Sequence, residues 1–173
     1  MKKMPLPFNI TLFAPEIPQN TGAIGRLAVA TGSCLHLIEP LGFSLEDKYV
    51  RRAGMDYWEH LNYTVYPDWE KFLSCNPGSR LHFFSTHGGT SYFDVKYRPG
   101  DFLVFGRESA GLPPEFYERY RHQLCLIPMP GQFYRSLNLA NSVSIALYEA
   151  LRQTRAEWDD ATEDGVAEKG LNL

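Results

Sequence analysis

The pattern that decides the fold stands in the stretch DFLVFGRESAGLPPEFYERY, residues 101–120. Its apolar start, residues 101–105, predicts a buried strand. A loop that contains two glycines follows. Residues 113–120 then predict a helix that opens on proline, where the missing N–H costs little. The stretch is therefore interpreted as a strand, a loop and a helix in immediate succession.

The same alternation extends through the rest of the chain. Further strands are predicted at residues 8–13, 35–38, 61–66, 81–85 and 124–127, and further helices at 22–31, 45–53, from 67 onward and from 136 to about 158. Strands that alternate with helices indicate an α/β domain with a mainly parallel sheet and flanking helices. We predict one domain over residues 1–155, followed by an acidic and flexible C-terminal tail at 156–173.

Charge is spread unevenly along the chain. The 173 residues have a net charge of −3, but residues 154–173 hold six acids and two bases, so the remaining 153 residues carry a net charge of +1. A near-neutral body with local basic clusters can bind RNA, because phosphates respond to local charge. The run Lys48, Arg51 and Arg52 is one candidate cluster, and a solvated helix face is the alternative interpretation.

Several classes of protein do not fit the composition. No apolar run approaches the roughly 18–20 residues of a membrane span, and no apolar signal core follows the first residues, so we expect a cytoplasmic protein without a membrane partner. Cys34, Cys75 and Cys125 lie far apart without metal-ligand spacing and are interpreted as buried reduced thiols. No carboxylate or histidine cluster predicts a catalytic metal.

Three segments that directly follow predicted strands are rich in small residues. They are residues 85–89, 106–113 and 127–142. In parallel sheets ligands bind beyond the carboxyl ends of the strands, and glycine lets a backbone approach a ligand closely. The three segments could therefore bind a flat, polar ligand such as adenine, although each alone could be a plain turn. The 106–111 segment is neither a Rossmann fingerprint nor a P-loop.

Two predicted helices begin with polar residues. The last helix carries Asn138 and Asn141 in its first turns, where free N–H groups favour anions; plain capping by Ser136 or Asn138 is the alternative. Its apolar stripe indicates core or dimer packing. The first helix is expected to be capped around Asn20 or Thr21. It carries Arg26, which could equally be a solvated surface residue.

Taken together, these residues resemble a known family, the SPOUT RNA 2'-O-methyltransferases. The matching motifs are Asn20-Thr21-Gly22 with Gly25-Arg26, then Phe105-Gly106-x-Glu108-x-x-Gly111-Leu112-Pro113, then Ile127-Pro128-Met129 with Ser136-Leu137-Asn138-Leu139-Ala140-Asn141. Their order and spacing match over about residues 8–155. The short length, the stretch 38–43 and the stretch 51–57 are similar to small bacterial enzymes that methylate the wobble nucleotide of tRNA.

The resemblance implies a fold, a reaction and a set of site residues. The α/β fold would carry a C-terminal deep trefoil knot, and two copies would form a homodimer that shares its active sites. The methyl donor, S-adenosylmethionine, would contact Phe84, Gly106, Ile127 and Ser136. Arg26 would be the catalytic arginine. Arg51, Arg52 and Arg135 are the candidate RNA contacts, and Tyr148 matches a position linked to the dimer interface.

The resemblance also implies the substrate. The expected acceptor is the ribose 2'-hydroxyl of the wobble nucleotide, a cytidine or modified uridine, in the anticodon loop of a tRNA, with tRNA-Leu as the expected species. Alternatives are the same reaction at another tRNA or rRNA site, a non-catalytic RNA-binding protein of this fold, or a generic nucleotide-binding domain. Three departures from the family concern His87, where many relatives have lysine, the aromatic loop 130–134, and the acidic tail.

The chemistry of methyl transfer limits what Arg26 can do. A guanidinium with a pKa above about 12 is a poor base. We therefore expect Arg26 to bind the adjacent phosphate and stabilise the developing alkoxide, while a phosphate oxygen or water accepts the proton. His87 is the alternative base, because histidine's ordinary pKa suits proton transfer.

Overall fold

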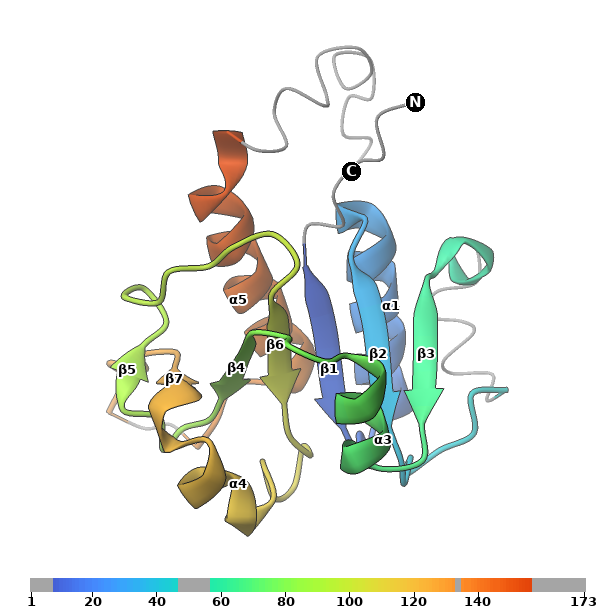
Figure 1. Cartoon of the computed structure of the whole chain (residues 1–173), viewed down its shortest axis with the longest axis horizontal. Coiled ribbons are helices and arrows are strands. Elements are labelled where there is room, and N and C mark those ends of the chain that lie inside the picture. Colours follow the sequence, from blue (N-terminus) through green and yellow to red (C-terminus); the bar gives the residue numbers. More distant parts are fainter. Residues whose placement is uncertain (1–7, 47–56, 133–134, 157–173) are drawn as a thin grey trace.

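The computed structural model describes residues 8–46, 57–132 and 135–156 (Figure 1). Its strands are β1 (Asn9–Phe13), β2 (Cys34–Ile38), β3 (Tyr63–Tyr66), β4 (Leu81–Phe84), β5 (Thr90–Ser91), β6 (Phe102–Phe105) and β7 (Leu124–Leu126). Its helices are α1 (Pro18–Thr31), α3 (Trp69–Cys75), α4 (Pro114–Arg119) and α5 (Leu139–Gln153), with short 3-10 turns η1 (Trp58–His60) and η2 (Arg121–Gln123).

The strands form one seven-stranded sheet in the order β3-β2-β1-β6-β4-β7-β5. Each strand pairs with its neighbours in parallel, so the predicted mainly parallel α/β class is confirmed. All seven strands therefore point their carboxyl ends to the same edge of the sheet. Strand β4 lies between β6 and β7, so the segments that follow these three strands meet at that edge.

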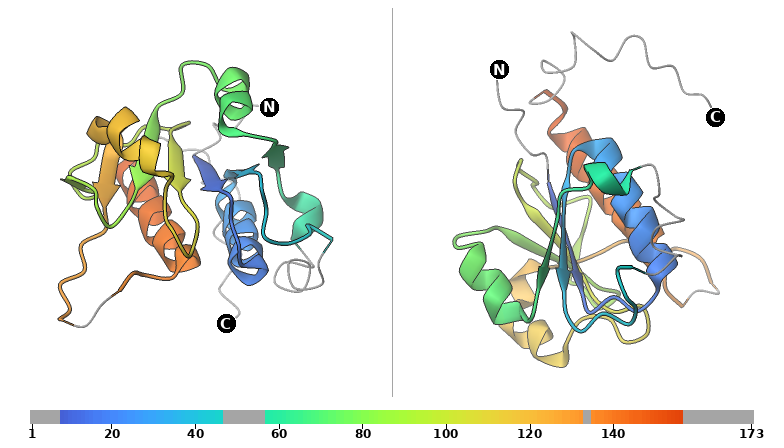
Figure 2. Two further views of the ribbon diagram at one scale, coloured as in Figure 1. Left: turned by 90° about the horizontal axis from the view of Figure 1, so that it is seen from below. Right: turned by 90° about the vertical axis from the view of Figure 1, so that its right-hand side faces the viewer.

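Helices cover both faces of the sheet (Figure 2). One face carries α1 and α5, which pack against each other and bury Ile24, Ala28 and Leu147 in one apolar core. The other face carries α3 and α4, whose Phe72 and Phe116 belong to a second core. The apolar stripe predicted on the last helix is confirmed as a buried face of α5.

The first helix begins earlier than the sequence predicted. Pro18 occupies its first turn and Ile17 precedes it in extended conformation, so Asn20 and Thr21 are buried inside the helix and do not cap it. The predicted start at residue 22 was wrong because proline, which needs no N–H partner, opens the helix. The helix ends at Gly32, whose left-handed φ of 65° lets its N–H bond back to the last turn.

Other boundaries also differ from the predictions. The last helix begins at Leu139 instead of residue 136, because Asn138 caps it through a bond from the Asn141 N–H to its Oδ1. The strand expected at 61–66 starts at Tyr63. The short polar strand β5 was not predicted. Of the helix expected at 45–53, residues 45 and 46 are not helical, and the rest lies outside the described residues.

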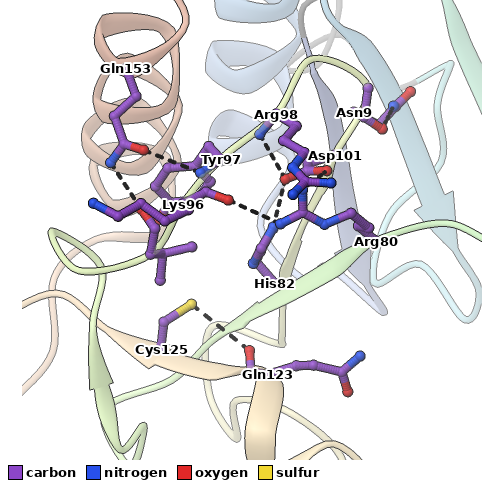
Figure 3. Close-up of polar contacts among 12 residues, drawn as sticks. Asn9, Arg80, His82, Lys96, Tyr97, Arg98, Asp101, Gln123, Cys125 and Gln153 are labelled. Carbon is purple, nitrogen blue, oxygen red and sulfur yellow. Dashed lines mark hydrogen bonds and ion pairs between the residues drawn. The ribbon is translucent and has the colours of Figure 1, made fainter.

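A polar cluster occupies the amino-terminal edge of the sheet (Figure 3). Asp101, only 3% exposed, precedes β6 and accepts hydrogen bonds at 2.8 Å from His82 Nε2 and at 3.0 Å from the Arg98 N–H. Arg80 Nη1 lies 3.6 Å from its other oxygen and also donates through Nη2 to the Lys96 carbonyl. The carboxylate is thus surrounded by three donor residues from two segments, Arg80 and His82 from one and Arg98 from the other.

Three further features of the fold bear on the predictions. Cys34, Cys75 and Cys125 are free thiols; Cys34 and Cys125 are buried as predicted, but the prediction was wrong for Cys75, which lies exposed at the end of α3. None of the helices in the described part of the chain is long and apolar enough to cross a membrane. The trefoil knot and the flexible tail stay predictions; residues 157–173 lie outside the described ranges.

Candidate active site

A cavity of about 630 Å³ lies at the carboxyl edge of the sheet. Its lining comes from the three segments singled out in the sequence, with residues of 84–87, 105–111 and 127–142, together with Ile17, Asn20 and Tyr117. The predicted donor-binding residues Phe84, Gly106, Ile127 and Ser136 all line it. The parallel sheet brings them together because β4, β6 and β7 end side by side.

One wall of the cavity is apolar. The rings of Phe84 and Phe105, at the ends of neighbouring strands, stack with centroids 4.7 Å apart and an interplanar angle of 11°. Both side chains are nearly fully buried. Because so little of either ring is accessible, the pair forms a rigid apolar support beneath the cavity and not an open stacking face.

The loop after β6 is held close to itself at Gly106. The backbones of Arg107 and Gly111 exchange two hydrogen bonds of 2.9 Å, and Gly111 has a φ of +69°, which favours glycine. A Cβ atom added to Gly106 would lie 2.1 Å from the carbonyl carbon of Gly111. Any side chain at position 106 would therefore push the loop out of place.

Glu108 joins this loop to the start of α1. Its Oε2 accepts a bond of 2.8 Å from the Glu16 N–H, and its Oε1 accepts bonds from the Ile17 N–H at 3.2 Å and from Asn20 Nδ2 at 3.1 Å. Glu108 thus satisfies free N–H groups at the beginning of a helix about ninety residues away, the arrangement that a helix N-terminus favours.

Asn20 continues the same network to the last helix. Its Oδ1 accepts a bond of 2.9 Å from Nδ2 of Asn138, and Asn138 in turn caps α5. The hydrogen bonds from Glu108 through Asn20 to Asn138 therefore connect the three family motifs, those that contain Asn20, Glu108 and Asn138. Capping was the plain alternative for Asn138, and the structure shows that this residue both caps its helix and bonds across to α1.

Glu16 forms a second link between the same two regions. Its carboxylate accepts bonds of 2.9 Å from both the hydroxyl and the backbone N–H of Ser109. These two bonds hold the pKa of Glu16 below its ordinary value, with a smaller contribution from the charge of Arg107. The loop that lines the cavity is consequently fastened to the segment before α1 from both directions.

His87 lies at the mouth of the cavity. Its exposed ring meets that of Tyr117 edge to face with centroids 5.8 Å apart, and Tyr117 OH lies 3.2 Å from the hydroxyl of Ser85. The backbone N–H of His87 also donates to that hydroxyl at 3.1 Å. The imidazole is therefore placed where it could face a molecule that enters the cavity.

Arg26 is not brought to this cavity within the single chain. It lies in the third turn of α1, later than the first turns that the sequence predicted, and is exposed to solvent. Its guanidinium carbon lies 5.1 Å from the centroid of the Tyr57 ring. Arg26 is not among the cavity-lining residues.

The candidate RNA contacts divide into two groups. Arg135 is exposed and lines a neighbouring groove of about 730 Å³ that shares Ile127 and Ser136 with the main cavity. Arg51 and Arg52 lie outside the described residues. Within the described residues, no group of three or more histidine, cysteine, aspartate or glutamate side chains is placed to hold a metal ion.

Sequence reasoning missed several residues that organise the site. Glu108 was noticed only as a motif position, Asn20 only as a motif position and a candidate helix cap, and Tyr117 was not singled out. The Gly-x-Glu spacing was the available signal for Glu108. Its partners at Glu16 and Ile17 come from a distant part of the chain, so their contact becomes visible only once the sheet order is known.

Comparison with known proteins agrees with the motifs. Residues 7–148 match the SpoU rRNA Methylase family. A tRNA (cytidine(34)-2'-O)-methyltransferase of Polaromonas sp. is 49% identical over 150 residues, which cover 84% of this chain and 90% of the relative.

Solved structures show the same likeness. A structure concerned with 2-OH methylation of C/U34 on tRNA has a TM-score of 0.82 and 45% identity, covering 86% of this chain and 97% of the other. An AdoMet-bound rRNA methyltransferase from Sinorhizobium meliloti has a TM-score of 0.75 and 28% identity, covering 84% and 56% of the two chains. The predicted resemblance is confirmed: the chain belongs to the SpoU rRNA methylase family.

Proposed function

We propose that this protein transfers a methyl group from S-adenosylmethionine to the ribose 2'-hydroxyl of the wobble nucleotide of a tRNA. The observation that carries the proposal is the cavity at the carboxyl edge. The three family motifs meet there and are joined by hydrogen bonds among Glu108, Asn20 and Asn138. Relatives of nearly equal length that carry this activity by name support the choice of reaction and substrate.

The residues of the cavity fit the methyl donor. Its volume of about 630 Å³ falls within the roughly 300–1,000 Å³ of small-molecule sites. We assign the adenine ring to the aromatic and glycine-bounded part formed by Phe84, Phe105 and Gly106, where backbone groups can read its edge. Ile127 and Ser136 would contact the remainder of the donor. The AdoMet-bound rRNA methyltransferase structure of similar fold supports the choice of S-adenosylmethionine as the ligand.

When bound, S-adenosylmethionine supplies an already activated methyl group. The protein must then align the ribose hydroxyl, exclude water and accommodate the proton that leaves the hydroxyl. We propose that Arg26 binds the phosphate beside the target ribose and stabilises negative charge that develops on the 2'-oxygen. A phosphate oxygen or a water molecule accepts the proton. His87 at the cavity mouth is the second candidate for that role.

A homodimer with shared active sites would reconcile the position of Arg26 with this role. Within one chain Arg26 does not line the cavity. The exposed side of α5 carries Ile145 and Tyr148, which are three positions apart on the helix and 36% and 58% exposed, so they form an exposed apolar pair. We propose that a second copy covers this side of α5. Sedimentation that gives a stable 19.7 kDa species at micromolar concentration would contradict the proposal.

The RNA contacts are proposed on the basis of charge and position. Arg135 borders the donor cavity, and Arg51 and Arg52 form a basic run in the sequence. An anticodon loop suits such a protein, because its bases are unstacked and its ribose hydroxyls accessible. We propose a leucine tRNA as the acceptor species. A tRNA substrate is also the reason to propose the cytoplasm as the place of action.

The test is methyl transfer with labelled S-adenosylmethionine and a set of purified tRNAs, followed by mapping of the modified nucleotide. We expect label on the wobble ribose of tRNA-Leu without added metal. Label at another tRNA or rRNA position would support the alternative acceptor instead. Donor binding without transfer to any RNA would favour a non-catalytic protein. Donor titration by calorimetry distinguishes these outcomes from a failure to bind the donor at all.

A further inference from the structure

The surroundings of Arg26 contain a partner that neither the motifs nor the relatives' names assign. The guanidinium carbon of Arg26 lies 5.1 Å from the centroid of the Tyr57 ring, within the roughly 6 Å at which a cation and an aromatic face attract each other. We propose that Tyr57 is a positioning residue that holds the Arg26 guanidinium ready for the RNA. The inference rests on the proposed function of Arg26 in methyl transfer.

The fold fixes the Tyr57 ring beside α1. Tyr57 directly precedes η1, and the next residue, Trp58, is half-buried and packs against the main core. A Cβ atom at Gly25, next to Arg26, would lie 3.1 Å from Leu61 Cδ2 and 3.3 Å from Trp58 Cζ3. The glycine therefore allows the segment 58–61 to approach α1 closely, and this approach brings Tyr57 to Arg26.

An aromatic face suits this task better than a carboxylate would. Within the described parts of the chain, no carboxylate pairs with Arg26. A carboxylate would compete with RNA phosphate for the N–H donors of the guanidinium. A ring accepts none of these donors in ordinary hydrogen bonds, so all five remain available for phosphate and ribose oxygens. The contact restricts the long side chain and leaves its charge unneutralised.

The effect is expected on turnover, because the ring acts through Arg26. In Tyr57→Leu, kcat for methyl transfer should fall about tenfold, which corresponds to roughly 1.4 kcal/mol of lost transition-state stabilisation. The Kd for S-adenosylmethionine should be unchanged, which also shows that the variant is folded. Tyr57→Phe keeps the aromatic face and should retain nearly full kcat.

A control separates this effect from the loss of any exposed aromatic ring. Phe93 is 58% exposed and follows β5, which stands at the opposite end of the sheet from β3. Phe93→Leu should leave kcat close to that of the wild type. Equal losses in Tyr57→Leu and Phe93→Leu would overturn the proposal, because the Arg26 contact would then be irrelevant to turnover.

An isosteric series keeps the test informative even if Tyr57→Leu does not fold. Phenylalanines with increasing numbers of ring fluorines at position 57 weaken the negative face with little change in shape. We expect kcat to fall stepwise along the series, and a flat series would overturn the proposal. Arg26→Ala serves as the reference: if this variant retains full activity, the proposed function of Arg26 itself is wrong, whereas its inactivity with a flat series refutes the role of Tyr57 alone.

Discussion

The two ends of the same parallel strands are built differently. At the amino-terminal edge, Asp101 is buried among His82, Arg80 and the Arg98 N–H, and the polar groups satisfy one another. At the carboxyl edge, the polar groups bond between distant segments and surround an open cavity of about 630 Å³. The amino-terminal cluster borders a groove of about 400 Å³ through Arg80 and His82, but its charged groups are paired with one another. A polar cluster beside a cavity therefore does not by itself indicate function. The carboxyl edge differs because its hydrogen bonds join the three family motifs around the cavity.

We expect mutations at the two edges of the sheet to have two different kinds of effect. Changes at the amino-terminal edge should lower the free energy of unfolding and leave the donor affinity intact, because that cluster borders no part of the main cavity. Changes at the carboxyl edge should lower donor affinity first. Measuring the unfolding free energy and the donor affinity of the same variant therefore tests whether the two edges differ in this way.

The largest effect is expected at Gly106. Replacement by valine places a Cβ atom 2.1 Å from the backbone of Gly111, so the loop must move away from its present position. Donor affinity measured by calorimetry should fall about a thousandfold, equivalent to roughly 4 kcal/mol. Gly89→Ala is the control, since a Cβ there meets nothing within 4 Å. Unchanged affinity in Gly106→Val would remove this loop from the donor site.

Asp101→Ala should show the opposite combination. Removal of the buried carboxylate leaves the His82 ring and the Arg98 N–H without their acceptor, which should lower the unfolding free energy by about 3 kcal/mol. Urea unfolding measures this loss, and calorimetry should find normal donor affinity. Asp94→Ala, an exposed carboxylate in the same region, is the matched control. A loss of donor binding without loss of stability would reverse the assigned roles of the two edges.

Acid should lower the free energy of unfolding through His36, which lies in β2. Burial lowers the pKa of His36 to about 4, while its ring nitrogens lie near Tyr66 OH and Asn9 Oδ1 at 3.0 and 3.1 Å. The unfolded chain takes up the proton near the ordinary pKa of about 6.5. The stabilising difference is therefore complete above about pH 6.5 and is lost as the pH falls toward 4.

The size of this pH-dependent loss of stability can be measured by urea unfolding at two pH values. Between pH 7 and pH 5 the unfolding free energy should fall by about 2 kcal/mol on account of His36. In His36→Gln this part of the pH dependence should disappear, although the variant is less stable at pH 7. Identical pH dependence of urea unfolding in the two proteins would contradict the role given to His36.

The smallest effect is expected at Glu108. In Glu108→Gln the negative charge that faces the start of α1 is lost. The glutamine side chain keeps only one acceptor oxygen, so its NH2 group must face the N–H of either Glu16 or Ile17, which then lacks an acceptor. We expect a loss of about 1 kcal/mol in stability and a similar loss in donor binding, because the network also positions the loop. Glu115→Gln on the exposed surface of α4 makes the same chemical change as a control.

The two edges also differ in how far the sequence could predict them. Apolar runs identified β1, β2, β4, β6 and β7, because buried parallel strands are nearly continuous in hydrophobic residues. Glycine-rich segments after those strands located the cavity. The strand β5, only two polar residues long, owes its conformation to pairing with β7 and carries no local signal.

Long-range bonds were beyond sequence reasoning for a physical reason. Glu108 bonds to residues more than eighty positions away, and Asp101 meets His82 only because β4 and β6 are neighbours. Neither contact leaves a periodic pattern in the sequence. The start of α1 was predicted too late because Asn20 and Thr21 are residue types that commonly cap helices, whereas here both are buried inside the helix and Asn20 bonds to Glu108 and Asn138.

Methyl transfer to the wobble 2'-oxygen requires a hydroxyl at that position, so removal of this hydroxyl from the substrate is the decisive experiment. Two tRNA samples would be compared that differ only in the wobble ribose, which carries a 2'-hydroxyl in one and hydrogen in the other. We expect labelling from S-adenosylmethionine in the first sample and none in the second. Continued methylation of the 2'-deoxy tRNA would contradict the proposed function and place the target at another position.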